Sequence, residues 1–162
     1  MLSFLRQLNR ERISLSSSSF WLLFSSAFFL SIIQNSEIFS LFGIKINLIL
    51  SFIVALAFSE IFNKDYLLIS ISIVIFSKFT PGMDRESISV LVMIFLFFLT
   101  SKSFSINAIT IYLLTFISSF IFYIILDYQF IINNLFIVSI EAFLNSFSAI
   151  LMYSLINRIK SF

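Results

Sequence analysis

Long, unbroken runs of apolar residues constrain this chain more than any other feature of its sequence. In the clearest run, residues 91–99, every residue is apolar. Strands of an outer-membrane barrel alternate apolar and polar residues, which these runs do not. Soluble sheets need many turn residues, and the chain has two Gly and one Pro. In lipid each peptide group must be bonded within its own segment, so the runs predict α-helices.

Charged residues are too few to form a surface that faces water. Asp, Glu, Lys and Arg make up 11% of the chain, compared with about 25% in an average soluble domain. The mean hydropathy of +1.10 supports the same conclusion. We therefore expect an integral membrane protein for which lipid is the main solvent.

Polar breaks divide the sequence into six apolar stretches. These are residues 17–33, 44–62, 66–79, 87–100, 106–126 and 131–156. A helix that crosses a membrane needs about 20 residues, with a lower limit near 17. The third and fourth stretches reach this length only with their polar flanks, with Lys78 extending toward the membrane surface. We expect six crossings, and the alternative is that these two stretches form one re-entrant hairpin.

The clearest break is at residues 80–86, which include Pro81 and Gly82. Within it, Asp84 is expected to cap the helix that follows, because Asp is a preferred N-cap residue. Glu86 suits the positive N-terminus of the same helix. The break therefore predicts a turn followed at once by a helix.

The distribution of Lys and Arg predicts the orientation, because cytoplasmic loops of membrane proteins are richer in both. With an internal N-terminus, the cytoplasmic side holds Arg6, Arg10, Arg12, Lys64, Lys102, Arg158 and Lys160, and the outside holds Lys45, Lys78 and Arg85. A hairpin in place of two crossings would leave the termini on one side. The sequence therefore predicts an all-α integral membrane protein, a bundle of about six transmembrane helices with cytoplasmic N- and C-termini. Residues 1–162 form a single polytopic transmembrane domain with a short basic cytoplasmic leader at 1–16.

The residue types needed for several kinds of chemistry are missing. Cys and His are both absent, which excludes disulfides, thiolate or imidazole metal ligands, and a Ser-His-Asp triad. The net charge of +2 is too small to predict a nucleic-acid partner. No phosphate-binding or dinucleotide-binding motif is present. We expect no catalytic residue, no cofactor and no metal site, and therefore no enzyme.

The last apolar stretch carries a stripe of polar residues. Glu141 lies near its middle, Asn145 follows at i+4, and Asn134 and Ser148 lie seven residues to either side of Glu141. At about 100° per residue the four share one narrow face of a helix. A carboxylate in lipid is costly, so this face should point into the bundle or at a partner, with Glu141 protonated or hydrogen-bonded. We favour packing against hydroxyls of neighbouring helices over a proton or substrate site, because no second intramembrane charge is evident to complete a relay.

Two other stretches carry small residues at four-residue spacing. Ser51, Ala55 and Ser59 follow this spacing in the second stretch, and Thr115 and Ser119 follow it in the fifth. Small residues allow membrane helices to approach closely. The spacing therefore favours close packing of these two helices.

Three segments of the chain are similar to segments of one known family. At residues 46–50 Asn47 and Leu48 open an aliphatic run, and residues 100–103 lead into the run 113–118. Residues 141–153 place Asn145 among small residues before a basic end. Together with size and span count, these segments resemble bacterial MreD, the membrane subunit of the rod-shape machinery. The chain lacks the Gly and Asp of that family's third span and the Pro of its last helix.

The resemblance implies a non-enzymatic membrane scaffold subunit of the cell-shape and peptidoglycan elongation machinery. It implies a multi-pass protein of the bacterial cytoplasmic (inner) membrane, with the lipid bilayer and a single-span MreC-like protein as partners. The alternative is a small-molecule transport module, such as the substrate-binding S component of an energy-coupling-factor transporter, which also has six helices. The short outer loops offer few polar or aromatic groups for an outward-facing ligand pocket, which argues against this alternative.

Overall fold

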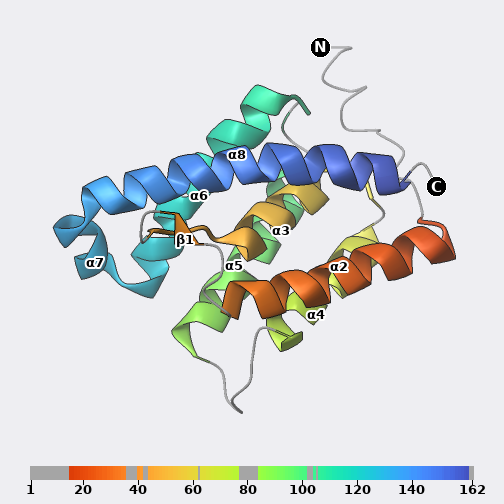
Figure 1. Cartoon of the computed structure of the whole chain (residues 1–162), viewed down its shortest axis with the longest axis horizontal. Helices are drawn as coiled ribbons and strands as arrows, with labels where there is room; N and C mark the ends of the chain where they lie inside the picture. Colours follow the sequence, from red (N-terminus) through yellow and green to blue (C-terminus); the bar gives the residue numbers. More distant parts are fainter. Residues whose placement is uncertain are drawn as a thin grey trace.

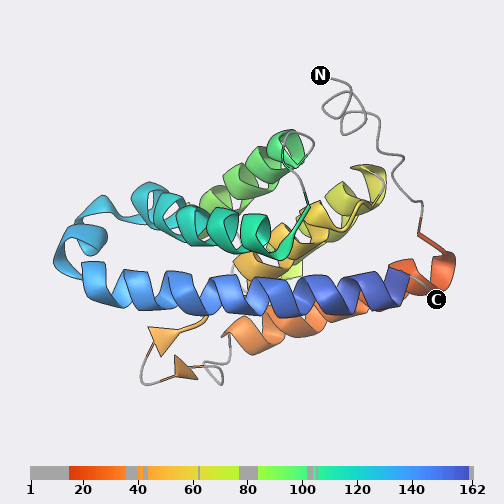
Figure 2. The same cartoon turned by 90° about the horizontal axis from the view of Figure 1, so that it is seen from above.

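Helices arranged around one central helix form the computed structural model of the protein (Figures 1 and 2). The structure describes residues 15–35, 40–41, 44–61, 63–76, 84–101, 104 and 106–160. Its helices are α2 (Ser17–Asn35), α3 (Leu48–Phe58), α4 (Asn63–Phe76), α5 (Arg85–Thr100), α6 (Ala108–Leu126), α7 (Tyr128–Asn133) and α8 (Leu135–Lys160). Between α2 and α3, strand β1 (Ser40–Leu41) pairs antiparallel with β2 (Ile44–Lys45). Residues 1–14 of the predicted leader, the predicted turn at 80–83 and Lys102 lie outside the described residues.

The predicted helical fold is confirmed, and three of the described helices are candidate membrane spans, which is consistent with a helical membrane protein. Helices α2 (over Ser17–Gln34), α6 and α8 are long and apolar enough to cross a bilayer. Helices α3, α4 and α5 have 11, 14 and 16 residues. At 1.5 Å per residue α3 is about 16 Å long, roughly half of the hydrocarbon core of a bilayer. Six full crossings and cytoplasmic termini therefore stay predictions.

The second apolar stretch is not the continuous helix that we expected over residues 44–62. Ile44 belongs to a strand, and α3 begins only after Asn47, whose side chain accepts a hydrogen bond from the Leu50 N–H at 3.0 Å. The helix ends at Phe58, and Glu60 adopts a φ of 58°. A residue other than Gly rarely enters this left-handed region, and it cannot continue a right-handed helix.

The last apolar stretch is also divided, at Asn134. There the backbone leaves the helical region (φ −131°, ψ 32°) and the side chain donates to the Phe130 carbonyl at 3.1 Å. An Asn side chain that bonds a nearby carbonyl competes with the backbone hydrogen bonds of a helix. The prediction of one helix over 131–156 was therefore wrong at Asn134. Asp127 starts the short helix α7 by accepting from the backbone N–H groups of Gln129 and Phe130. Helix α8 then continues to Lys160, beyond the expected end.

Helix α3 forms the centre of the bundle. Each of its residues is buried, and it packs against α2, α4, α5, α6 and α8. Figures 1 and 2 show α8 running the length of the molecule, and α8 makes its most extensive contacts with α6 and α3. Asp84 caps α5 as predicted, with its Oδ1 accepting from the Ser87 N–H at 2.9 Å.

Polarity is distributed in the opposite way to that of a soluble protein. Large apolar side chains lie outside, for example Phe136 and Ile109, which are 78% and 70% exposed. Hydroxyl groups lie inside, and the serines that are at most 1% exposed are Ser31, Ser51, Ser59, Ser70, Ser89, Ser119 and Ser146. Most of these hydroxyls donate to the carbonyl four residues earlier, as Ser146 does to Ala142 at 2.7 Å. A soluble monomer rarely exposes so much contiguous apolar surface, so this distribution suits lipid.

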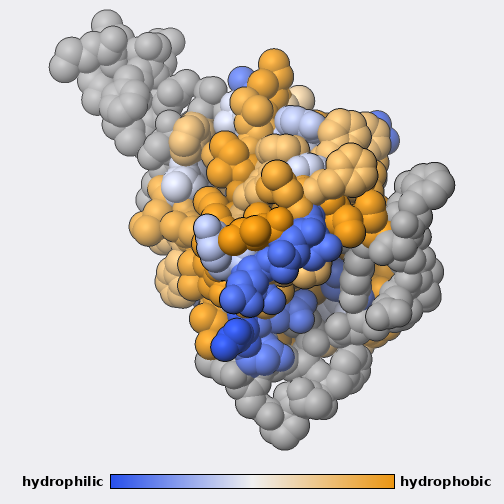
Figure 3. Space-filling model, turned by 90° about the vertical axis from the view of Figure 1, so that its left-hand side faces the viewer, coloured by the Kyte–Doolittle hydropathy of each residue, from blue (hydrophilic) through white to orange (hydrophobic). Residues whose placement is uncertain are grey.

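The start of α2, the junction of α3 and α4, and the end of α8 meet at one end of the bundle, which we call the terminal end. The Ser19 hydroxyl donates to the Ile159 carbonyl at 3.0 Å, and the Leu15 N–H donates to Asp65 at 3.3 Å. The Lys160 ammonium donates to the Ser59 carbonyl. The opposite end, where α6 meets α7, is the α7 end. Figure 3 faces the α7 end and shows a strip of hydrophilic residues (blue) across an otherwise hydrophobic surface.

We predict that reporter fusions at Lys64, Lys102 and the C-terminus report cytoplasm, whereas fusions at Pro81 and Asp127 report the outside. Lys64 at the start of α4 and the end of α8 both belong to the terminal end, so these two fusions must agree. The measurement uses two reporter proteins, one that is active only in the cytoplasm and one that is active only outside it. A cytoplasmic signal at Pro81, with both termini inside, would instead identify α4 and α5 as a re-entrant hairpin.

Candidate functional site

Glu141 and Asn145 of the predicted polar stripe lie inside the bundle. They are 5% and 0% exposed, and they lie on α8, which packs against α3 and α6. A polar side chain at such depth must find hydrogen-bond partners in the protein, since neither water nor lipid supplies them. The candidate site is therefore the set of groups that these two residues contact.

Asn145 joins three helices. Its Oδ1 accepts from the backbone N–H of Asn47 at 2.7 Å, and its Nδ2 donates to the Ser119 hydroxyl on α6 at 3.1 Å. Its backbone carbonyl accepts from the Ser51 hydroxyl on α3 at 2.9 Å. We call Asn47, Ser51, Ser119 and Asn145 the polar knot. Both ends of the Asn145 amide are thus engaged, one by the start of α3 and the other by α6.

The polar knot and Gln34 together bond three N–H groups at the N-terminus of α3. The first four N–H groups of a helix have no partner within the helix. Here Asn145 bonds the Asn47 N–H, Gln34 at the end of α2 bonds the Leu48 N–H at 2.8 Å, and the Asn47 side chain bonds the Leu50 N–H. Because α3 is buried from its first residue, amide oxygens from α2 and α8 take the place that water takes at an exposed helix start.

Glu141 lies one turn before Asn145 and contacts α6. Its Oε2 accepts a hydrogen bond from the Tyr123 hydroxyl at 2.5 Å. The Tyr123 ring stacks on Phe130 of α7, with ring centroids 5.4 Å apart and an interplanar angle of 23°. The carboxyl group of Glu141 therefore links α8 to Tyr123 of α6, and Phe130 of α7 packs against the same Tyr123.

The structure does not bring all four residues of the predicted stripe together. Asn134 lies in the break between α7 and α8, where its side chain bonds to the Phe130 carbonyl. Ser148 is half-buried, one turn from Asn145 toward the terminal end. The periodicity argument assumed one continuous helix, and the interruption at Asn134 removes that residue from the regular face.

Several partners of the site were not predicted as site residues. Asn47 before an aliphatic run has the pattern of an N-cap, a preferred position for Asn, and this signal is readable in the sequence. Ser51 and Ser119 were noted only for their small-residue spacing. Gln34 and Tyr123 carry no signal of this kind, because their roles depend on which helices become neighbours.

The chemistry of the site is that of hydrogen-bonded packing. The polar knot contains amides, hydroxyls and backbone groups, and no ionisable side chain. Among the residues that the structure describes, no group of three or more Asp or Glu side chains could hold a metal ion. The arrangement orients α2, α3, α6 and α8 relative to one another.

We predict that Asn145→Leu lowers the free energy of unfolding by about 2 kcal/mol, because it leaves the buried Asn47 N–H without its acceptor. For a chain of this size such a loss lowers the midpoint of thermal unfolding by about 4–8 °C. Ser148→Ala, on the same helix and half-buried, is the control and should change the midpoint little. The measurement is thermal unfolding in detergent, and equal midpoints for the two variants would contradict the assigned role of Asn145.

Comparison with known proteins identifies no relative for this site or for the chain. No protein-family model, curated protein or solved structure matches it.

Proposed function

We propose that the chain is a non-enzymatic membrane scaffold subunit of the cell-shape and peptidoglycan elongation machinery, similar to MreD. It would cross the bacterial cytoplasmic (inner) membrane about six times and hold a single-span MreC-like partner. The observation that supports this proposal best is the engagement of Asn145, whose two amide ends bond α3 and α6. A fully buried polar group of α8 thus contributes to the shape of the bundle, as a scaffold requires.

The surroundings of Glu141 support the scaffold over a proton relay. A relay needs a succession of titratable groups through the membrane. Within α6 and α8 Glu141 is the only acidic residue, and the Tyr123 phenol of α6 donates a hydrogen bond to it. This contact suits a carboxyl group that holds two helices together.

The distribution of charge supports the proposed orientation. At the terminal end the described charged residues are three basic and two acidic, namely Lys64, Arg158, Lys160, Glu60 and Asp65. At the start of α5 and the end of α6 they are one basic and three acidic, namely Arg85, Asp84, Glu86 and Asp127. Basic residues concentrate on the cytoplasmic side of membrane proteins, so we place the terminal end there.

A first test separates scaffold from relay at Glu141. We predict that Glu141→Gln retains function, because the Gln carbonyl can still accept the bond from Tyr123. We predict that Glu141→Leu weakens folding or partner assembly, because the Tyr123 hydroxyl loses its partner at a cost of about 1–3 kcal/mol. The measurements are restoration of rod shape in cells lacking the gene, at matched expression, and co-purification of the MreC-like partner. Loss of function in Glu141→Gln with intact assembly would show that the carboxyl group exchanges a proton.

A second test addresses transport. We predict that vitamin-sized molecules do not stabilise the purified protein. A ligand present at 100 times its dissociation constant would add about 2.7 kcal/mol to the free energy of unfolding, which a thermal shift would detect. Such a stabilisation, together with co-purification of an ATPase, would favour a transport module over a scaffold.

A further inference from the structure

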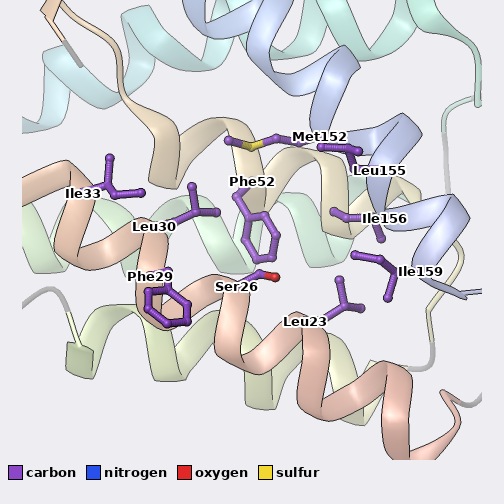
Figure 4. Close-up of a pocket in the computed structure, with 10 residues that line it drawn as sticks. All are labelled: Leu23, Ser26, Phe29, Leu30, Ile33, Phe52, Met152, Leu155, Ile156 and Ile159. Atoms are coloured by element: carbon purple, nitrogen blue, oxygen red, sulfur yellow. The ribbon is translucent and has the colours of Figure 1, made fainter. Parts of the chain in front are cut away.

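An apolar groove lies between α2 and α8, and α3 contributes Phe52 to its lining (Figure 4). Its volume is about 290 Å³, and it is lined by Leu23, Ser26, Phe29, Leu30, Ile33, Phe52, Met152, Leu155, Ile156 and Ile159. Ser26 is the single polar residue of the lining, and its hydroxyl donates to the Leu22 carbonyl at 2.8 Å. The groove therefore offers an occupant an apolar surface.

The groove opens on the apolar surface of the bundle. Phe29 and Leu155 line it and are 61% and 58% exposed. The two helices that carry them, α2 and α8, are both candidate membrane spans. In a bilayer, lipid tails therefore reach the groove directly.

The length of the groove matches one leaflet of a bilayer. The α2 lining from Leu23 to Ile33 covers about 15 Å, at 1.5 Å per residue. This is half of a hydrocarbon core of about 30 Å, or the depth of one leaflet.

Two basic residues are neighbours in sequence of the last lining residue of α8, at the terminal end. Arg158 and Lys160 flank the lining residue Ile159 on α8, and Lys160 reaches across to the Ser59 carbonyl of α3. Basic pockets between membrane helices bind anionic lipid headgroups, and each Lys or Arg contributes about 1 kcal/mol near an anionic surface. Glu60 and Asp65 also lie at this end, and Glu60 interacts electrostatically with Lys160, so we expect Arg158 to contribute most of the attraction.

We propose that the groove holds one acyl chain of an anionic phospholipid from the leaflet at the terminal end, with the lipid phosphate near Arg158 and Lys160. The apolar lining, the length of one leaflet and the basic residues at one end together define this ligand. The proposal depends on the membrane location of the chain and not on the scaffold function, so either can fail without the other.

Two substitution pairs test the acyl-chain site. The full chain is purified in detergent and exchanged into nanodiscs of equal phosphatidylglycerol and phosphatidylcholine. Retained lipid is then counted by native mass spectrometry after release. Ser26→Phe fills the groove, and its control is Ser25→Phe on the exposed face of α2. Leu155→Trp narrows the opening from α8, and its control is Leu151→Trp, which is exposed but does not line the groove.

We expect the unchanged protein to retain phosphatidylglycerol, and both groove variants to lose most of it while the controls keep it. Arg158→Gln should lower the preference for phosphatidylglycerol over phosphatidylcholine about fivefold, whereas Lys64→Gln, at the same end, should not. Thermal unfolding of each variant shows whether it is folded. If Ser26→Phe is not folded, Leu155→Trp and its control Leu151→Trp decide the test. Equal lipid retention in groove variants and controls overturns the proposal. If the groove variants lose a co-purifying protein while lipid retention is unchanged, side chains of a protein partner occupy the groove and the proposal is overturned.

Discussion

The amino end of α3 is the point on which the arrangement of this bundle depends. A buried helix start has N–H groups that neither lipid nor apolar side chains can satisfy, and each group left unpaired would cost about 1–3 kcal/mol. Two of these groups are bonded by amide oxygens from other helices, Gln34 of α2 and Asn145 of α8. The positions of α2 and α8 are therefore linked to the position of the central helix. Helix α6 is joined to the same point through Ser119.

Serine makes this close packing possible in a chain with two Gly. A serine hydroxyl that donates to the carbonyl four residues earlier, as Ser59 does to Ala55, presents a small side chain with its donor already engaged. Such residues allow helices to approach but give little preference for one arrangement over another. The side-chain amides of Gln34 and Asn145 supply that preference, because their bonds have direction and particular partners on other helices. Hydroxyls inside and apolar side chains outside together match a solvent that forms no hydrogen bonds.

The positions of the helices could be predicted because apolar runs and polar breaks depend on local sequence. The two main errors, at Asn47 and Asn134, have one cause. An Asn side chain that bonds a nearby backbone group can start or interrupt a helix without changing the hydrophobic pattern around it. Helical periodicity was enough to select Glu141 and Asn145 as residues of the candidate site. It could not identify Tyr123 or Gln34 as their neighbours, because those contacts depend on how helices distant in sequence pack.

The bond between Asn47 and Asn145 joins residues 98 positions apart in the chain. At a synthesis rate of about 5–20 residues per second, the acceptor for the Asn47 N–H emerges from the ribosome about 5–20 s after the donor. During that interval the start of α3 has to be bonded by water or by the insertion machinery. The central helix is thus made early but can take its final place only when the last helix enters the membrane. A nascent chain interrupted before α8 would lack the group that closes its core, which makes assembly of the bundle a late step of biosynthesis.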